Sequence, residues 1–223
     1  MIKYHPDTRF LTDYAAGSLP QSQALCVAAH LHYCPACRTR VGELTLLGAE
    51  LFASQAPVGV APGSFEKVMG RIEQLPRETG TGIPASGSST SRNDGLPGVI
   101  RKITRGNIEN LSWRHIGKAF RFSTIRLGDG QRETSLLHIR AGGAIPAHRH
   151  RGDEITVILQ GSFSDSEDRY HVGDYLVRTR GETHTPVASQ DEDCLCLATL
   201  DAPIVMKNLF YRMLMPLFNR PTA

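Results

Sequence analysis

The sequence predicts an α + β protein of two domains, in which a small helical domain precedes a C-terminal β-barrel of the jelly-roll type. Apolar residues in positions 1–75 recur every three or four residues, which is the spacing of amphipathic helices. From about residue 99 they alternate instead with a period of two, as in half-buried strands. Residues 76–98 are mainly Gly, Pro, Ser and Thr. Because such a segment buries little apolar surface, we expect a flexible linker at 76–98 between domains 1–75 and 99–223.

The N-terminal domain contains start and stop signals for four short helices. Asp7 can cap a first helix that stops at Gly17, and Ser18 opens a capping box before a second helix. A third helix is expected over residues 36–53, and a fourth after a cap at Ser64. Helices of this length are marginal on their own, so we expect them to pack on one another or to be held by a crosslink.

The C-terminal domain is rich in short β-forming runs that are separated by Gly, Asp and Pro turns. These runs are FRFSTIRL, TSLLHIR, ITVILQG, YLVRT and CLCLATL. Many short strands with regular turns predict a barrel or jelly roll. Residues 208–219 (NLFYRMLMPLFN) predict a terminal amphipathic helix that is kinked at Pro216.

Composition excludes several classes of protein. The 223 residues are 40% hydrophobic and 21% charged, which is ordinary for a globular chain. No apolar run reaches the roughly 18 residues of a membrane span, and the first residues lack the apolar core of a signal peptide. The five cysteines, two of them in a CxxC, suit a reducing compartment better than a disulfide scaffold. We therefore expect a cytoplasmic protein.

Four side chains of the β-region have the spacing of a metal site. His148 and His150 are two residues apart, so on a strand both point to the same side. Glu154 follows an Arg-Gly-Asp bend and can return to the same centre, and His184 comes about thirty residues later. With their flanking glycines, these residues resemble the two motifs of the cupin superfamily, over roughly residues 103–205. The resemblance implies a small β-barrel with these four residues around one metal.

Ligand type does not identify the cupin metal, because three imidazoles and one carboxylate suit Zn, Mn, Fe, Ni or Cu. The second motif departs from the usual pattern, with Thr179 in place of Pro and Ala188 in place of Asn. Neither position is a ligand, so the departure affects only the turn. Cys194 and Cys196 share one face of a strand, either close to the metal or, as we expect, packed in the core. Histidines outside the motifs are expected to be surface or structural groups: His115, His138 and His171.

A second set of metal-binding residue types lies in the helical domain. His30 is one helical turn before Cys34, and Cys34 and Cys37 form a CxxC between two expected helices. Two thiolates from one turn are half of a typical tetrahedral zinc site. The spacing leaves both His5 and Cys26 as candidates for the fourth ligand. A thioredoxin-like redox pair is disfavoured, because no βαβ pattern surrounds the CxxC.

The phrase SLPQSQALCVAAHLHYCPACR, followed by a linker and a cupin motif, closely resembles the ChrR-type zinc-binding anti-sigma factors. The joint resemblance spans nearly the whole chain. It implies that zinc is held by His5, His30, Cys34 and Cys37. It also implies a partner, an ECF-type RNA polymerase sigma factor, which the N-terminal domain would sequester. The cupin domain would then sense an oxidative signal such as singlet oxygen or an organic peroxide.

The charge of the first 75 residues fits a protein partner better than nucleic acid. Basic and acidic residues balance there, with Lys3, Arg9, Arg38, Arg40, Lys67 and Arg71 against Asp7, Asp13, Glu43, Glu50, Glu66 and Glu73. A neutral domain has little electrostatic attraction to a phosphate backbone, so we expect no direct binding of nucleic acid. The expected helix at 64–75 could wrap around the sigma factor or pack on the other three helices.

The main alternative is a cupin metalloenzyme, a dioxygenase or an isomerase, because this ligand set also supports O2 chemistry. No second acid–base pair is evident near the motifs, although Tyr175 and Glu182 are close, and we expect no catalytic residue. Release of a sigma factor could follow from a signal that favours a non-binding state, or from proteolysis in the linker. The cupin domain could also pair into a homodimer.

Overall fold

The computed structural model describes residues 2–75, 95–128 and 132–207. Five α-helices and one short 3-10 helix occur in these residues. They are α1 (Thr8–Ala15), α2 (Gln21–Tyr33), α3 (Pro35–Ala53), α4 (Ser64–Gln74), α5 (Gly98–Ile103) and the 3-10 helix Ile108–Asn110. The helix expected at 208–219 and most of the expected linker lie outside the described residues. None of the described helices is long and apolar enough to cross a membrane.

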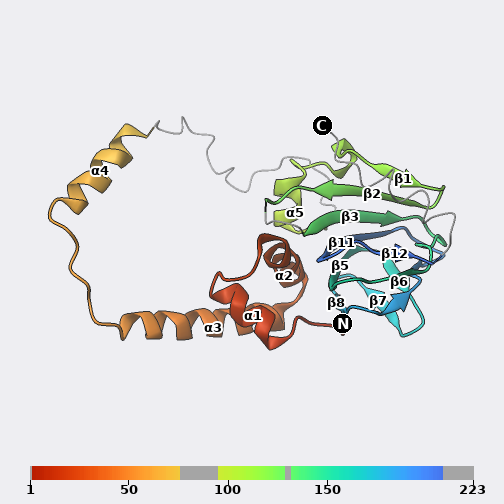
Figure 1. Cartoon of the computed structure of the whole chain (residues 1–223), viewed down its shortest axis with the longest axis horizontal. Coiled ribbons are helices and arrows are strands. Elements are labelled where there is room, and N and C mark those ends of the chain that lie inside the picture. Colours follow the sequence, from red (N-terminus) through yellow and green to blue (C-terminus); the bar gives the residue numbers. More distant parts are fainter. Residues whose placement is uncertain (1, 76–94, 129–131, 208–223) are drawn as a thin grey trace.

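Strands form one large sheet and two small ones, all antiparallel. The large sheet contains, in order, β1 (Arg114–Ile116), β2 (Phe120–Ile125), β3 (Glu133–Ile139), β11 (Cys194–Leu200), β5 (Glu154–Gln160) and β8 (Tyr175–Arg178). The small sheets are β10 (Val187–Ala188) with β6 (Ser162–Ser164) and β7 (Arg169–His171), and β12 (Val205–Met206) with β4 (His148–Arg149) and β9 (Thr183–His184). The sheets pack as a sandwich (Figure 1). The expected order of a helical part followed by a cupin-like jelly roll is confirmed.

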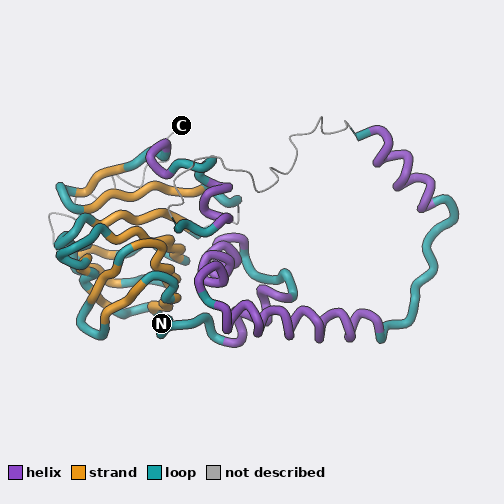
Figure 2. Tube along the Cα trace, turned by 180° about the vertical axis from the view of Figure 1, so that it is seen from behind, coloured by secondary structure: helices purple, strands orange, loops and turns teal. Residues whose placement is uncertain are grey.

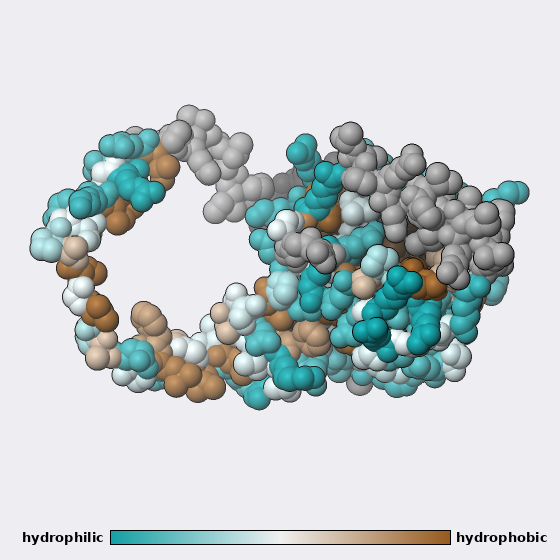
Figure 3. Space-filling view, viewed as in Figure 1, coloured by the Kyte–Doolittle hydropathy of each residue, from teal (hydrophilic) through white to brown (hydrophobic). Residues whose placement is uncertain are grey.

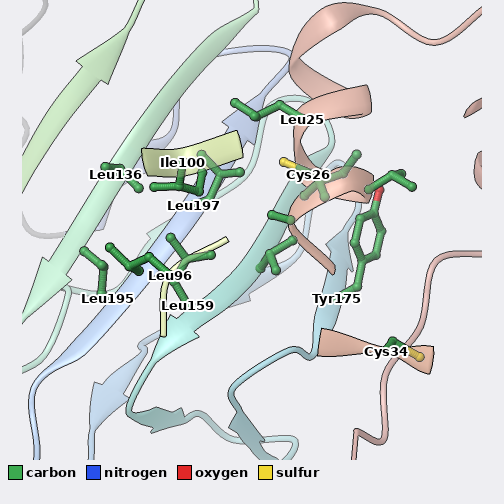
Figure 4. Packing of buried hydrophobic residues seen from close by; sticks show 14 of the residues in the cluster. Leu25, Cys26, Cys34, Leu96, Ile100, Leu136, Leu159, Tyr175, Leu195 and Leu197 are labelled. Carbon is green, nitrogen blue, oxygen red and sulfur yellow. The ribbon is translucent and has the colours of Figure 1, made fainter. Parts of the chain in front are cut away.

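Helix α2 packs directly on the large sheet, so that the helical part and the sandwich share one apolar core. Figure 2 shows the helical part lying directly against the sandwich. Leu25 of α2, Ile100 of α5 and Leu197 of β11 belong to the same buried cluster. Figure 4 shows Leu25 and Cys26 beside Ile100 and Leu197. Burial of apolar surface is the main source of folding free energy, so this seam holds the two parts together.

The sequence before the first helix also lies against the sandwich. The backbone N–H of Tyr175 donates to the carbonyl of Tyr4 (3.0 Å), which extends the edge of β8. Gly173 has φ +90°, and a Cβ there would meet Ile2 Cδ1 at 2.6 Å and Tyr33 Cβ at 2.9 Å. Only glycine combines this backbone conformation with such a close approach.

The helix starts differ in part from the sequence prediction. Asp7 caps α1 as expected, since its carboxylate accepts from the backbone N–H of Arg9. The prediction that Ser18 and Ser64 cap the second and fourth helices is wrong. Each hydroxyl instead donates to a carbonyl of the preceding chain, at Asp13 and at Ala61. A serine hydroxyl can bond locally in several ways, and here the preceding turn takes it.

The alternating pattern begins later than expected. Residues 98–103 and 108–110 are helical, and the first strand starts only at Arg114. Leu96, which lies inside the expected linker, is buried in the shared core. Leu96 and Ile100 pack beside α2 on the same face of the large sheet, and this tertiary packing overrides the local pattern.

The second half of α3 and all of α4 extend away from the sandwich as an arm (Figure 1). No residue of α4 is buried. Of the two alternatives for this helix, packing on the other three helices is therefore wrong for the isolated chain. Apolar side chains gather along the arm, as the brown patches of Figure 3 show. The exposed ones are Leu46, Leu47, Leu51, Phe52, Val58, Val60, Phe65, Val68, Met69, Ile72 and Leu75.

Candidate metal centres

The helical part brings its four candidate ligands together. One ligand atom from each of His5, His30, Cys34 and Cys37 lies within 4.8 Å of all the others. His30 lies in the last turn of α2, Cys34 joins α2 to α3, and Cys37 lies in the first turn of α3. His5 arrives from the extended segment before α1. Cys26 is outside this cluster, in the apolar core.

The geometry of this cluster fits zinc. His5 Nδ1 lies 3.5 Å from Sγ of both Cys34 and Cys37. Tetrahedral zinc with ordinary Zn–S and Zn–N bonds places a sulfur and a nitrogen ligand about 3.5 Å apart. His30 Nδ1 donates to the carbonyl of Gly173 (2.6 Å), while its Nε2 is buried with no hydrogen-bond partner. A hydrogen bond from one ring nitrogen orients a metal-binding imidazole and leaves the other ring nitrogen free to bind the ion.

Burial favours the uncharged forms of the side chains in this cluster. Desolvation lowers the pKa of His30 to about 4, and it raises the pKa of the Cys37 thiol to about 12, with help from the neighbouring Cys34. A neutral imidazole is the form that binds a metal, whereas the thiols must lose their protons. A divalent cation supplies the charge that stabilises two thiolates in this position.

The sandwich brings its four candidate ligands together from two sheets. His148 on β4 is the direct antiparallel neighbour of His184 on β9. His150 follows β4, and its backbone bonds to the turn before β9 at Glu182. Glu154 is the first residue of β5 in the large sheet. The four ligand atoms lie within 4.8 Å of one another, and His148, Glu154 and His184 line the cavity between the sheets.

Distances in this second cluster also fit an ion. His184 Nε2 lies 2.9 Å from His148 Nε2 and 3.1 Å from His150 Nε2, and Glu154 Oε2 lies 3.2 Å from His150 Nε2. Glu154 Oε2 is buried with no hydrogen-bond partner. Burial lowers the pKa of His148 to about 3 and raises the pKa of Glu154 to about 7. The donor set is neutral imidazoles and one carboxylate that needs a cation.

A carboxylate that the sequence did not indicate holds His184 in place. Asp165, in the β6–β7 turn, has a fully buried side chain and lies 3.2 Å from His184 Nδ1 through its Oδ2. Arg178 donates to the same oxygen (2.7 Å), and Tyr170 donates to the other (3.1 Å). This contact aims His184 Nε2 at the cluster, as the carboxylate partners of metal-binding histidines do.

The same turn reaches the N-terminal segment. Asp168 accepts hydrogen bonds from Lys3 Nζ and Tyr4 Oη, and the rings of Tyr4 and Tyr170 are 5.2 Å apart, edge to face. Tyr4 directly precedes His5. The β6–β7 turn therefore contacts one ligand of the sandwich cluster and the neighbour of one ligand of the helical cluster.

Other candidates from the sequence have separate positions. Cys194 and Cys196 face inward on β11 with their sulfurs 3.5 Å apart, and Cys196 lines the cavity beside Glu154. Tyr175 packs against His30. His115 and His171 are exposed. His138 is partly buried, with its Nε2 3.1 Å from a carboxylate oxygen of Asp193.

Comparison with known proteins agrees with both parts of this structure. The family model of the ChrR cupin-like domain matches residues 103–202, and a zinc-finger family matches residues 8–38. The anti-sigma-E factor ChrR of Cereibacter sphaeroides is 36% identical over 218 residues, which cover 98% of this chain and 99% of that protein. This chain belongs to the ChrR family of anti-sigma factors.

A solved structure of the ChrR family has the same fold. In the crystal structure of Rhodobacter sphaeroides SigE in complex with the anti-sigma ChrR, one chain matches with a TM-score of 0.75 and 35% identity, over 90% of this chain and 100% of that one. The ChrR family is one of anti-sigma factors and not of enzymes, which rules against the cupin metalloenzyme. Neither family match includes His5, which precedes the zinc-finger region.

Proposed function

We propose that this chain sequesters an ECF-type RNA polymerase sigma factor in the cytoplasm and releases it after an oxidative signal. The observation that carries the proposal is the arm of α3 and α4, whose apolar side chains are exposed over both helices. Soluble proteins rarely leave such a contiguous apolar surface uncovered unless it binds a partner. Membership of the ChrR family, and the SigE complex of one relative, indicate the class of partner.

The His/Cys cluster would set the direction of the arm. Cys34 and Cys37 lie at the start of α3, and His5 and His30 lie on the parts that pack against the sandwich. Zinc at these four residues would fix the base of α3 to the body of the protein. A bound ion supplies stability that short helices lack, so sigma binding would depend on the metal. Residues 1–75 would form the anti-sigma domain, 76–98 the linker and 99–223 the cupin domain.

The cupin domain would receive the signal. His148, His150, Glu154 and His184 would hold a divalent ion, whether Zn, Fe, Mn or Ni, beside an internal cavity. Singlet oxygen or an organic peroxide is the kind of signal we propose. Two contacts support transmission to the helical part, from Gly173 to His30 and from Asp168 to Tyr4. All five cysteines are free thiols, which suits the cytoplasm.

Association with purified ECF-type sigma factors tests this function. We expect one of them to bind the full chain with submicromolar affinity, while a housekeeping sigma factor does not. Replacement of both Cys34→Ser and Cys37→Ser should remove binding, whereas Cys194→Ala, a thiol outside the zinc cluster, should keep it. Normal sigma binding by the double variant would refute the role of zinc.

A second pair of variants tests the surface itself. Phe65→Asp places a charge on the exposed face of α4 and should weaken sigma binding at least a hundredfold, as loss of a central apolar contact does. Val177→Asp makes the same kind of change on the sandwich, where 39% of the side chain is exposed, and should have no effect. Equal affinities of the two variants would exclude the arm as the binding surface.

A further inference from the structure

The cavity of the sandwich has features that the metal cluster does not explain. Its volume is about 100 Å³, and His148, Glu154 and His184 form one part of its wall. The rest is mainly apolar, with aromatic and aliphatic side chains from all three sheets. Among these are Phe120, Phe122, Leu137, Ile139, Phe163 and Met206. Most ligand sites are of this type, an apolar pocket with a few polar groups at one point.

One polar side chain in this wall has no partner. Ser135 on β3 is only 2% exposed, and its Oγ makes no hydrogen bond to any described residue. It lines the cavity on the same face of β3 as Leu137. A buried hydroxyl without a partner is unfavourable, so an unpaired one facing a cavity indicates a missing ligand group.

The strand register places Ser135 on the same face of the large sheet as Thr156 and Glu154, with β11 between them. Ser135 is paired with Ala198 on β11, and Ala198 is paired with Thr156 on β5. Thr156 donates to Glu154 Oε1 (3.2 Å). Because Ala198 is small, its side chain leaves open the space between Ser135 and Thr156, while Cys196 and Leu200 of β11 line the cavity on either side.

Charge indicates the chemistry of the ligand. Three neutral imidazoles and one carboxylate around a divalent ion leave one positive charge uncompensated. In an apolar cavity such a charge attracts an anion. Glu133 also lines the cavity, but the charge of the nearby Arg114 guanidinium offsets that of its carboxylate. The missing group is thus an anionic oxygen.

We propose that this cavity binds a small organic monoanion, a short branched-chain carboxylate in size and charge, with its oxygens between Ser135 and the metal cluster. The cavity is larger than the ~30 Å³ share of one water and smaller than the ~150 Å³ cavity that holds benzene, so the apolar body has about four or five carbons. This site deepens the sensing role proposed above and rests on it, since its occupancy would be one input to the cupin domain.

Calorimetric titration of the zinc-loaded full chain with 3-methylbutanoate tests the site. We expect measurable binding of this carboxylate, and at least tenfold weaker binding of the uncharged 3-methylbutanamide, which has the same shape. Ser135→Ala should weaken binding of the carboxylate about fivefold, which is the effect of losing one hydrogen bond. Ser135→Leu should fill the cavity and remove binding.

Controls separate a ligand group from a structural one. Ser123→Ala changes a buried serine of the neighbouring strand β2 that does not line the cavity, and it should bind as the native chain does. Without ligand, Ser135→Ala should melt no lower than the native protein, because its hydroxyl has no partner to lose. A lower melting temperature would show a structural role and overturn the assignment.

Absence of binding to the native chain, or equal binding by Ser135→Leu, would also overturn the site. The titration contains no sigma factor, so these results bear on the cavity alone. Failure of the proposed function would appear instead as normal sigma binding by the Cys34 and Cys37 double variant.

Discussion

The shared core between α2 and the large sheet leads to a prediction about cooperativity. Leu25 on α2 is 6% exposed and packs in the same cluster as Leu197 of β11. Replacement Leu25→Ala leaves a cavity at this seam, and such changes cost about 3 kcal/mol. In a chain of this length that loss lowers the melting temperature by roughly 6–12 °C.

Two signals follow the two parts separately. Circular dichroism at 222 nm is dominated by the helices, whereas fluorescence comes from Trp113, the single tryptophan, which lies beside the sheet. We expect the two transitions to coincide and to move together in Leu25→Ala. The matched control is Leu47→Ala, where the leucine is 56% exposed on α3 and the change should stay within about 0.5 kcal/mol.

One result would refute this reasoning. If Leu25→Ala lowered only the helical transition and left the fluorescence transition unchanged, the two parts would fold independently. The contacts of α2 with the sheet would then contribute little free energy.

Three further predictions concern single sites. Gly173→Ala should lower the free energy of unfolding in urea by about 3 kcal/mol, because a Cβ there would clash with Ile2. The control is Gly106→Ala, at φ +83° with no neighbour in reach, which gives the cost of backbone strain alone. Equal losses of stability in the two variants would contradict the close approach at Gly173. Asp165→Asn should lower the affinity of the cupin site for its metal about tenfold, measured in competition with a chelator. The control is Asp201→Asn, which removes a carboxylate that pairs with Arg132 and should leave the affinity unchanged. Unchanged affinity in both variants would mean that Asp165 does not orient His184. Removal of metal by a strong chelator should reduce the circular dichroism signal at 222 nm strongly and change the Trp113 fluorescence little, because the His/Cys cluster fixes the base of α3. An unchanged signal at 222 nm would exclude a structural zinc.

Local spacing predicted part of each cluster, whereas His5 and His184, which are distant along the chain, were expected from the resemblance to known families. His30, Cys34 and Cys37 lie within two helical turns, and His148 and His150 share one strand, so local periodicity is enough to place them together. Fold class followed for the same reason, since the change from a helical to a strand period is a local signal.

Long-range partners left no such signal. Asp165 lies 19 residues from His184, and nothing in its neighbours indicates that it turns inward. The packing of Leu96 and Ile100 under α2 overrides the apparent start of the β-pattern at residue 99. Likewise, Ser135 is one of many serines, and only the register of three strands shows that it has an unpaired hydroxyl in the cavity.

The seam between α2 and the sandwich also limits what proteolysis can achieve. A cut between residues 76 and 94 would break the covalent path from α4 to α5, yet α1, α2 and the base of α3 would stay attached through the buried cluster. The two fragments would remain one particle in gel filtration, with α4 fastened at one end only. Cleavage would thus weaken the contact of the arm with the partner without separating the cupin domain from the anti-sigma domain. Full release of the partner would need further digestion of the arm itself.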